Sequence, residues 1–365
     1  MNKQNNWLVG SLVAIVLIVA VVLWSNSINT GQSTSEGTIK IGAIYALTGP
    51  AAQFGQMSIQ GVKDAVAYFT ETTGKKVELI AEDSMGDPKT GTIAATKLFT
   101  VDKIKIAVVG MSGVSAAISP IAEKEKSLLI SDAALLGLTK DKHYTLQNFM
   151  PSLSDIAKQV NNNTAWKKVS VVYINDEFGN LWGKNIKNNL NTDKTVQDVS
   201  FEKTTADYRT GALKIKQFNP DVMVVVGYGS ALNQVFADLT VNQITTPIIS
   251  YLACTLPGVL TDKKFSLEGQ YSYEYPPISN KTINDWIIKN GRSVNTFYIG
   301  AFENTLLALT AARKTGSNPD NMISYLKRNT TPGLWGDVKF DNTGMVNRDL
   351  VLTKIANGVC VPVIK

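Results

Sequence analysis

Residues 39–69 constrain the fold of this chain most, because they contain the pattern of a strand, a loop and a helix in direct succession. Residues 39–46 form a short apolar run of the kind that is buried in a parallel sheet, and Gly49-Pro50 ends the run as a turn. Apolar residues then recur at helical spacing, namely Met57, Ile59, Val62, Val66 and Phe69. Ligands of open α/β sheets bind at the carboxyl ends of such strands, so we expect this loop to border a binding site.

The same alternation of apolar runs and amphipathic segments continues along the chain. Further strands are expected at 76–83, 104–109, 128–131, 168–174, 197–201, 222–226 and 248–252. Helices are expected at 87–98, 116–125, 178–190, 208–218, 231–239, 301–314 and 319–328. Short β segments at 338–340, 350–355 and 359–363 close the chain. This rhythm predicts an α/β protein with two Rossmann-like lobes, each a parallel sheet with helices on both faces.

Composition describes an ordinary globular protein, with 44% hydrophobic and 18% charged residues in a chain of 365, which is long enough for two packed lobes. The net charge of +6 is spread along the chain without a dense Lys/Arg tract, so we expect no nucleic-acid partner. His143 is the one histidine and lies in a polar loop, which argues against histidine-based metal sites and Ser-His catalysis.

Common catalytic and nucleotide-binding motifs are missing from the sequence. It contains no Gly-x-Gly-x-x-Gly, no phosphate-binding Gly-Lys-Ser/Thr and no Gly-x-Ser-x-Gly. We therefore predict that the protein is not an enzyme, with no catalytic residue, no metal and no cofactor.

Two cysteines, Cys254 and Cys360, lie far apart in the sequence. One disulfide bond and two unlinked buried thiols both fit this pattern, and the sequence leaves the choice open.

Residues 7–24 form an apolar run without charge, close to the roughly 20 residues that a helix needs to cross a bilayer. Lys3 precedes the run, so the positive-inside rule places residues 1–6 in the cytoplasm and the rest outside. An uncleaved transmembrane anchor and a cleaved signal segment both remain open, and we favour the anchor. Residues 25–37 then form a flexible tether. The globular part is expected to be extracytoplasmic, either held at the cell membrane or periplasmic or secreted.

Several motifs resemble those of the leucine/isoleucine/valine-binding family of extracytoplasmic solute-binding proteins, which serve ABC transporters. Leu47-Thr48-Gly49-Pro50 followed by Gly55 is similar to the opening of that family. The acidic turn 82–88, the turn Asn175-Asp176-Glu177-Phe178-Gly179 and the turn 340–344 resemble later family motifs in the same order. The resemblance spans roughly residues 40–365.

This resemblance implies the type I periplasmic binding protein fold, in which a hinge joins the two lobes and lets them close over a ligand. It implies that the chain passes between the lobes three times, near 149–151, 249–252 and 332–335. Lobe 1 would hold 38–150 plus 253–331, and lobe 2 would hold 151–252 plus 332–365.

The resemblance also implies a function, that of the receptor of an ABC importer, which binds a small amino-acid-like or carboxylate solute in the cleft between the lobes. The expected partners are the solute, the ABC permease subunits and, through the N-terminal segment, the membrane, and the receptor is expected to be monomeric. One alternative is a membrane-tethered sensing domain that acts with a separate signalling protein. Another is a receptor for amides or aromatic acids rather than amino acids.

Ser112 and Gly113 lie in the loop between a strand and a helix, where free backbone N–H groups attract anions. The family resemblance implies that Ser112 holds the ligand α-carboxylate. An alternative is that Ser112 or Ser115 only caps the helix.

Two positions depart from the family pattern. Ala133 and Ala134 occupy a loop that in the family offers a backbone carbonyl and a threonine hydroxyl, but Leu135 stands where the threonine is expected. The family acid for the ligand ammonium falls near Leu252, which cannot supply a counter-charge.

Burying an unpaired charge is strongly unfavourable. Either another acid therefore serves the ligand ammonium, with Asp132, Glu177 and Glu274 as candidates, or the ligand has no α-ammonium.

Aromatic side chains are expected to line the rest of the cleft, because they offer a large contact area with a polar tip. The predicted ligand-contacting aromatic residues are Phe178, Tyr228, Tyr251 and Phe297. Tyr273 and Phe54 are further candidates for its wall, although core packing explains any single one of these aromatic residues about as well.

Overall fold

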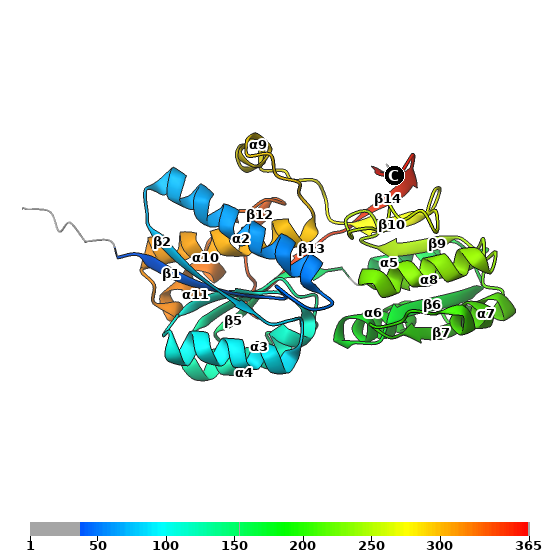
Figure 1. Cartoon of the computed structure of the whole chain (residues 1–365), viewed down its shortest axis with the longest axis horizontal. Coiled ribbons are helices and arrows are strands. Elements are labelled where there is room, and N and C mark those ends of the chain that lie inside the picture. The colour runs from blue at the N-terminus through cyan, green and yellow to red at the C-terminus, as the bar shows by residue number, and fades with distance from the viewer. Residues whose placement is uncertain (1–36, 153, 364–365) are drawn as a thin grey trace, which may run out of the picture. The chain divides into compact units, whose positions relative to one another are not determined.

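The computed structural model describes residues 37–152 and 154–363 of the chain. Two large sheets with helices packed on them belong to one compact unit, Ile39–Lys365 (Figure 1), which confirms the predicted α/β class. The N-terminus 1–6, the anchor or signal 7–24 and all but the last residue of the tether lie outside the described residues. Within the described part, none of the helices combines the length and the apolar character that a membrane span requires.

The first sheet has the strand order β13-β5-β4-β3-β1-β2, and its neighbouring strands are parallel. Its strands are β1 (Ile39–Tyr45), β2 (Val77–Asp83), β3 (Ile106–Val109), β4 (Leu128–Ser131), β5 (Thr145–Pro151) and β13 (Met345–Arg348). Strands β3, β4 and β5 are buried along their whole length, as expected for a parallel sheet covered on both faces.

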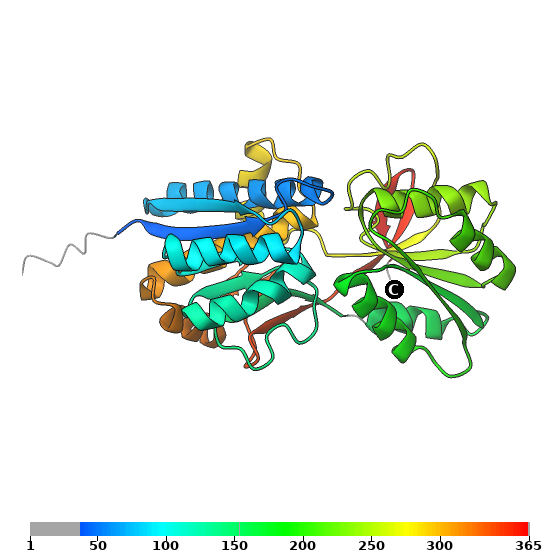
Figure 2. The same cartoon turned by 60° about the horizontal axis from the view of Figure 1, so that its bottom comes forward.

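Helices cover both faces of the first sheet (Figure 2). They are α2 (Ala52–Thr73), α3 (Pro88–Thr96) with the π-helical turn η1 (Lys97–Val101), α4 (Ser112–Glu125), α10 (Thr296–Thr315) and α11 (Pro319–Arg328). Alternate residues of β1 supply the two cores: Ile41 packs in the cluster with α2 and α10, and Ile44 packs in the cluster with α3 and α4. This alternation follows from the two-residue period of a strand.

The second sheet has the strand order β15-β14-β10-β9-β8-β6-β7. Its strands are β6 (Lys168–Ile174), β7 (Thr195–Phe201), β8 (Val222–Val226), β9 (Ile248–Tyr251), β10 (Tyr271–Glu274), β14 (Val351–Ala356) and β15 (Val359–Pro362). The run from β7 to β10 is parallel, and β14 and β15 extend it as antiparallel strands.

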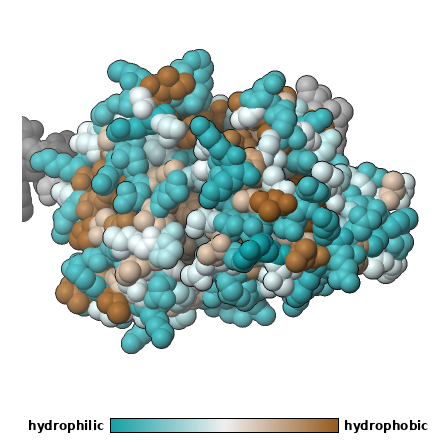
Figure 3. All heavy atoms as spheres, turned by 45° about the vertical axis from the view of Figure 1, so that its right-hand side comes forward, coloured by the Kyte–Doolittle hydropathy of each residue, from teal (hydrophilic) through white to brown (hydrophobic). Residues whose placement is uncertain are grey.

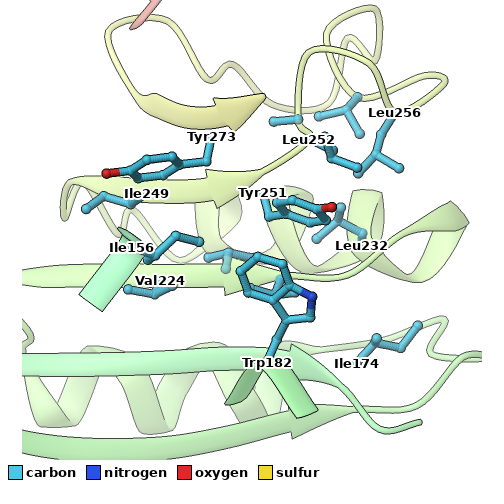
Figure 4. Packing of buried hydrophobic residues seen from close by; sticks show 14 of the residues in the cluster. Ile156, Ile174, Trp182, Val224, Leu232, Ile249, Tyr251, Leu252, Leu256 and Tyr273 are labelled. Carbon is cyan, nitrogen blue, oxygen red and sulfur yellow. The ribbon is translucent and has the colours of Figure 1, made fainter. Parts of the chain in front are cut away.

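Four helices belong to this sheet: α5 (Ser154–Asn162), α6 (Glu177–Asn189), α7 (Arg209–Phe218) and α8 (Gly229–Val241). Helix α5 packs on α6, and α7 packs on α8. Right-handed crossovers in the order β6-α6-β7-α7-β8 put the two pairs on opposite faces. In the core, Trp182 of α6 lies against Tyr251 at the end of β9, with ring centroids 4.3 Å apart (Figure 4).

Sheet membership differs from the predicted lobe boundaries at two places. Strand β10 lies in the predicted lobe 1 segment 253–331, but it pairs with β9, with Tyr271 opposite Ile249. Strand β13 lies in the predicted lobe 2 segment 332–365, but it pairs with β5. The first passage between the sheets follows β5 as expected, whereas the second follows β10 and the third follows β13. No strand is predicted from the sequence at either place, and local periodicity does not show which sheet a strand joins.

Cys254 and Cys360 form a disulfide bond, with their Cα atoms 6.1 Å apart. The bond ties the segment after β9 to β15, the edge strand of the second sheet. Of the two states that the sequence leaves open, the structure therefore has the disulfide.

A buried ion pair joins Glu303 of α10 to Arg348 at the end of β13. Asn148 of β5 donates to the Glu303 carboxylate at 2.8 Å and accepts from the Arg348 guanidinium at 3.0 Å. The backbone N–H groups of Leu334 and Trp335 also donate to Glu303. This network fixes residues 334–335 and the end of β13 to α10 and β5. After β13 the chain leaves the first sheet for the last time.

On the face shown in Figure 3, hydrophobic residues stand singly or in small groups among hydrophilic ones. Scattered apolar side chains of this kind are normal on soluble proteins.

Candidate functional site

A cavity lies where strands of both sheets reach their carboxyl ends. Ala46 follows β1, the segment 110–113 follows β3, and the segment 132–134 follows β4. From the second sheet, 176–178 follows β6 and Gly227-Tyr228 follows β8. The cavity measures about 120 Å³. Its position is the one that parallel α/β sheets use for ligands.

All eight residues predicted to bind the ligand line this one cavity. They are Ser112, Gly113, Ala133, Ala134, Phe178, Tyr228, Tyr251 and Phe297. They come from both sheets and from α10, so the structure assembles them from segments far apart in the sequence. Their contact with a ligand remains a prediction.

Helix α4 begins at Ser112, directly after Met111, which serves as N-cap with φ of +68° and makes no side-chain capping hydrogen bond. Ser112 is buried, and the Ser115 hydroxyl forms a hydrogen bond with the Ser131 hydroxyl at 2.9 Å. Capping by Ser112 or Ser115 is therefore not what the structure shows. The first turn of α4 borders the cavity with backbone N–H groups that no side chain caps, which is a site that attracts anions.

One acidic side chain from the start of α6, Glu177, approaches this helix end. A Cβ added to Gly113 would lie 2.9 Å from the Glu177 carboxylate, so Glu177 lies beside the start of α4. Asp176 caps α6 by accepting from the Gly179 N–H at 2.8 Å. It also accepts from the Tyr228 hydroxyl and lies 3.6 Å from the Lys203 ammonium. Burial and the nearby Asp176 carboxylate raise the pKa of Tyr228 far above its usual value.

Ala133 lies in a tightly bonded turn. Its N–H donates to the Ser131 hydroxyl at 3.0 Å, and its carbonyl accepts from the Gln147 side chain at 2.6 Å. The carbonyl that the family resemblance assigns to the ligand therefore already has one donor, and one lone pair remains.

Among the three candidate acids, Asp132 and Glu177 line the cavity and Glu274 does not. Glu274 accepts instead from the Cys254 N–H, the Thr255 hydroxyl and the Ser272 hydroxyl. Burial raises the pKa of Glu274 to about 7 in spite of these donors. These hydrogen bonds indicate a structural role for Glu274 beside the disulfide.

Asp132 follows β4 and accepts from the Tyr45 hydroxyl at 3.2 Å. Burial raises the pKa of Asp132 to about 7, because the Tyr45 hydroxyl and the Asp132 backbone N–H offset only part of the lost hydration. Within the described part of the chain, Asp132 forms an ion pair with no basic side chain.

Eight aromatic side chains line the cavity: Tyr45, Phe54, Phe149, Phe178, Tyr228, Tyr251, Tyr275 and Phe297. Phe54, in the first turn of α2, contacts Tyr228 across the cavity with ring centroids 5.7 Å apart and Phe297 at 4.8 Å. Tyr273, a candidate for this wall, is not among the lining residues, and its hydroxyl donates to the Asp155 carbonyl at 3.1 Å.

Sequence reasoning missed Tyr45, Phe149 and Tyr275 as wall residues. Tyr45 is the last residue of β1 and the next to last of the predicted strand 39–46, so the rule for strand ends could have found it. Phe149 belongs to β5 and Tyr275 follows β10, and neither strand is predicted from periodicity.

Comparisons with known proteins agree with this geometry. A family model described as periplasmic binding protein matches residues 38–359. The Leu/Ile/Val-binding protein of Citrobacter freundii is 23% identical over 323 residues, which cover 84% of this chain and 87% of that protein.

Solved structures have the same fold. The leucine binding protein LivK of Thermotoga maritima superposes with a TM-score of 0.80 at 19% identity, covering 90% of this chain and 98% of that one. A solute binding protein of an ABC transporter from Rhodopseudomonas palustris, in complex with p-hydroxybenzoic acid, superposes with a TM-score of 0.77 at 20% identity, covering 89% and 95%.

Proposed function

Because this chain belongs to the periplasmic binding protein family, we propose that it is the extracytoplasmic receptor of an ABC importer. It binds a small amino-acid-like or carboxylate solute and delivers it to permease subunits in the membrane. The receptor acts as a monomer without metal, cofactor or catalytic step. Its N-terminal segment holds it at the cell membrane, or releases it to the periplasm or medium if that segment is cleaved.

The observation that carries this proposal is the cavity itself. Loops at the carboxyl ends of both sheets line it, and the chain passes between the sheets after β5, β10 and β13. Closure about these three segments would bring the two walls together over a solute and exclude water. A receptor needs such a site and no catalytic group.

The first turn of α4 supplies the contact for a solute carboxylate. Ser112 adds a hydroxyl donor to the uncapped N–H groups there, and charge-assisted hydrogen bonds of this kind are the stronger ones. Glu177 lies beside the same helix end, so a bound carboxylate would share that end with it. The aromatic wall encloses the apolar part of the solute.

Solute binding is tested with the full-length chain in detergent, by calorimetry and thermal shift, against amino acids, their deaminated acids and amides. A ligand present well above its dissociation constant should stabilise the protein by a few kcal/mol. Ser112→Ala should weaken a carboxylate ligand by roughly 1.5–3 kcal/mol, or about 10- to 150-fold. Unchanged affinity in Ser112→Ala would remove Ser112 from the site, and no binding in any class would refute the receptor.

Two alternatives are separated by further measurements. In liposomes containing its permease, an import receptor should stimulate solute-dependent ATP hydrolysis, whereas a sensing domain should not. A receptor for aromatic acids, as in the complex of the Rhodopseudomonas palustris protein, should bind benzoates in preference to amino acids.

A further inference from the structure

The charged groups of the cavity are predominantly acidic. Among the lining residues, Asp132, Asp176 and Glu177 carry carboxyl groups and Lys203 carries the one ammonium. Lys203 and the Tyr228 hydroxyl both engage Asp176. The Lys203 ammonium is thus already paired with Asp176. The carboxyl groups of Asp132 and Glu177 therefore determine the electrostatic potential in the cavity.

Glu177 has partial compensation in place. It lies beside Gly113 in the first turn of α4, where the helix end carries a partial positive charge. A solute carboxylate would bring a further negative charge to this end. Glu177 therefore does not need a cation from the solute. The helix end can also hold a solute carboxylate if the solute carries a positive group elsewhere.

Asp132 has no such compensation within residues 37–152 and 154–363. Among these residues its one side-chain partner is the neutral Tyr45 hydroxyl at 3.2 Å. Backbone segments approach it closely: a Cβ at Gly110 would lie 3.0 Å from the Asp132 Oδ1, and one at Gly300 would lie 3.5 Å from its Cβ. Glycine at these two positions leaves room for the carboxyl group at the cavity wall. A carboxylate removed from water without a counter-ion is costly, and a cation in the cavity would remove that cost.

We propose that Asp132 is the specificity-determining acid of this cavity and that it pairs with an ammonium group of the solute. This inference rests on the receptor function proposed above and names the class of solute for it. The cavity selects amine-bearing solutes, amino acids or simple amines, over their deaminated acids. Asp132 thereby takes the role that Leu252, also in the cavity wall, cannot fill, and it acts from the first sheet instead of the second.

The aromatic wall supports the same class of solute. An ammonium group within about 6 Å of an aromatic face gains a further cation–π attraction. A deaminated acid would instead add negative charge to a cavity that already holds three carboxyl groups and one ammonium. Both effects favour an amine over the acid of the same shape.

Three matched series test the proposal by calorimetry on the full-length chain in detergent. They are phenylalanine and leucine, their deaminated acids 3-phenylpropanoate and 4-methylpentanoate, and the amines 2-phenylethylamine and 3-methylbutylamine. We expect at least one amine-bearing member to bind at least about tenfold more tightly than its deaminated acid. Asp132→Asn should abolish that preference and leave any affinity for the deaminated acids unchanged or increased.

Glu177→Gln is the matched variant, since it removes a second carboxylate from the same cavity. It should keep the preference for amines if Asp132 is responsible. A preference that falls as much in Glu177→Gln as in Asp132→Asn would assign the selectivity to general negative charge and overturn the proposal. Deaminated acids that bind wild type as tightly as the amines would overturn it too and leave the receptor function intact. Binding of none of the three classes would overturn both.

Proton release gives a second readout that needs no variant to fold. Burial raises the pKa of Asp132 to about 7, so at pH 6 an ammonium that pairs with Asp132 should displace roughly 0.9 proton from it. Calorimetry in two buffers of different ionisation enthalpy measures this number. Release at pH 6 that vanishes at pH 8 supports the pairing, and equal values at the two pH values contradict it.

Discussion

Asp132→Asn should stabilise the protein without ligand at alkaline pH, because it removes a carboxylate at the cavity wall that forms no ion pair within the described part of the chain. Burial raises the pKa of this carboxyl group from 3.8 to about 7. The difference is about three pKa units, each worth about 1.4 kcal/mol. Ionised Asp132 therefore costs the folded state up to about 4 kcal/mol at pH values well above 7.

The sign of the pH dependence follows from proton binding. Between pH 4 and 7 the folded protein holds the Asp132 proton and the unfolded chain has lost it, so the free energy of unfolding falls as the pH rises. The destabilisation by ionised Asp132 is complete at pH values well above 7. It is absent below about pH 4, the pKa of the aspartate in the unfolded chain. Asparagine cannot ionise and still offers an oxygen to the Tyr45 hydroxyl. The free energy of unfolding of Asp132→Asn, relative to that of wild type, should therefore rise by about 3 kcal/mol between pH 5 and pH 8.

Urea unfolding, followed by tryptophan fluorescence at pH 5 and pH 8, measures this difference. Comparing variant with wild type cancels groups that titrate alike in both. The titratable groups that face Asp132 or share its cavity are Tyr45, Tyr228, Tyr251, Tyr275, Asp176, Glu177 and Lys203. An advantage of the same size at both pH values, or a variant less stable than wild type at pH 8, would refute the reasoning.

Asp64→Asn is the contrasting control, because Asp64 is a buried acid that does have a cation. Its carboxylate accepts from the Arg292 guanidinium at 2.8 Å and from the Tyr298 hydroxyl at 2.9 Å. Removing its charge should lower stability at both pH values, since hydrogen bonds to charged groups contribute roughly 1.5–3 kcal/mol.

Three further changes test the packing that holds the site. Gly55→Ala places a Cβ 1.9 Å from the Ala46 carbonyl oxygen at the cavity edge, and we expect a fall in melting temperature or no folded protein; an unchanged melting temperature would contradict this contact. Glu303→Gln leaves Arg348 buried without its counter-charge and should cost about 3–5 kcal/mol in urea unfolding; a cost under 1 kcal/mol would show that the pair contributes little. Cys360→Ser opens a disulfide that spans 106 residues and should cost about 2–5 kcal/mol, and its melting temperature should no longer respond to reductant.

Much of the fold was readable because short-range patterns specify it. The strand-helix alternation predicted most elements of both sheets, and the α/β class is confirmed. Asp87 as N-cap before Pro88 is one such local signal, and Asp87 does accept from the Thr90 N–H at 2.9 Å. Strands β5 and β10 were not predicted. β5 is buried along its whole length although Gln147 and Asn148 interrupt its apolar run, and β10 has four residues.

The candidate site divides in the same way. Ser112, Phe178 and Tyr228 follow predicted strands, and all three line the cavity, as the rule for strand ends leads one to expect. Their contact with a ligand stays a prediction. The acid was left open among three candidates, because their sequence positions do not show which side chain has a partner. Only the folded arrangement shows that Glu274 accepts from the Cys254, Thr255 and Ser272 donors. Among the described side chains, Asp132 accepts from the Tyr45 hydroxyl alone.

The sequence by itself determined the class of fold, the order of most elements and the residues at most strand ends, because these depend on neighbours within a few positions along the chain. The tertiary structure decided which sheet each late strand joins, that Cys254 and Cys360 are bonded, and that Asp132 lies at the cavity wall without a basic partner among the described residues. Those outcomes depend on contacts between segments that lie far apart in the sequence. The free energy of such contacts comes from burial and pairing, which no local pattern records.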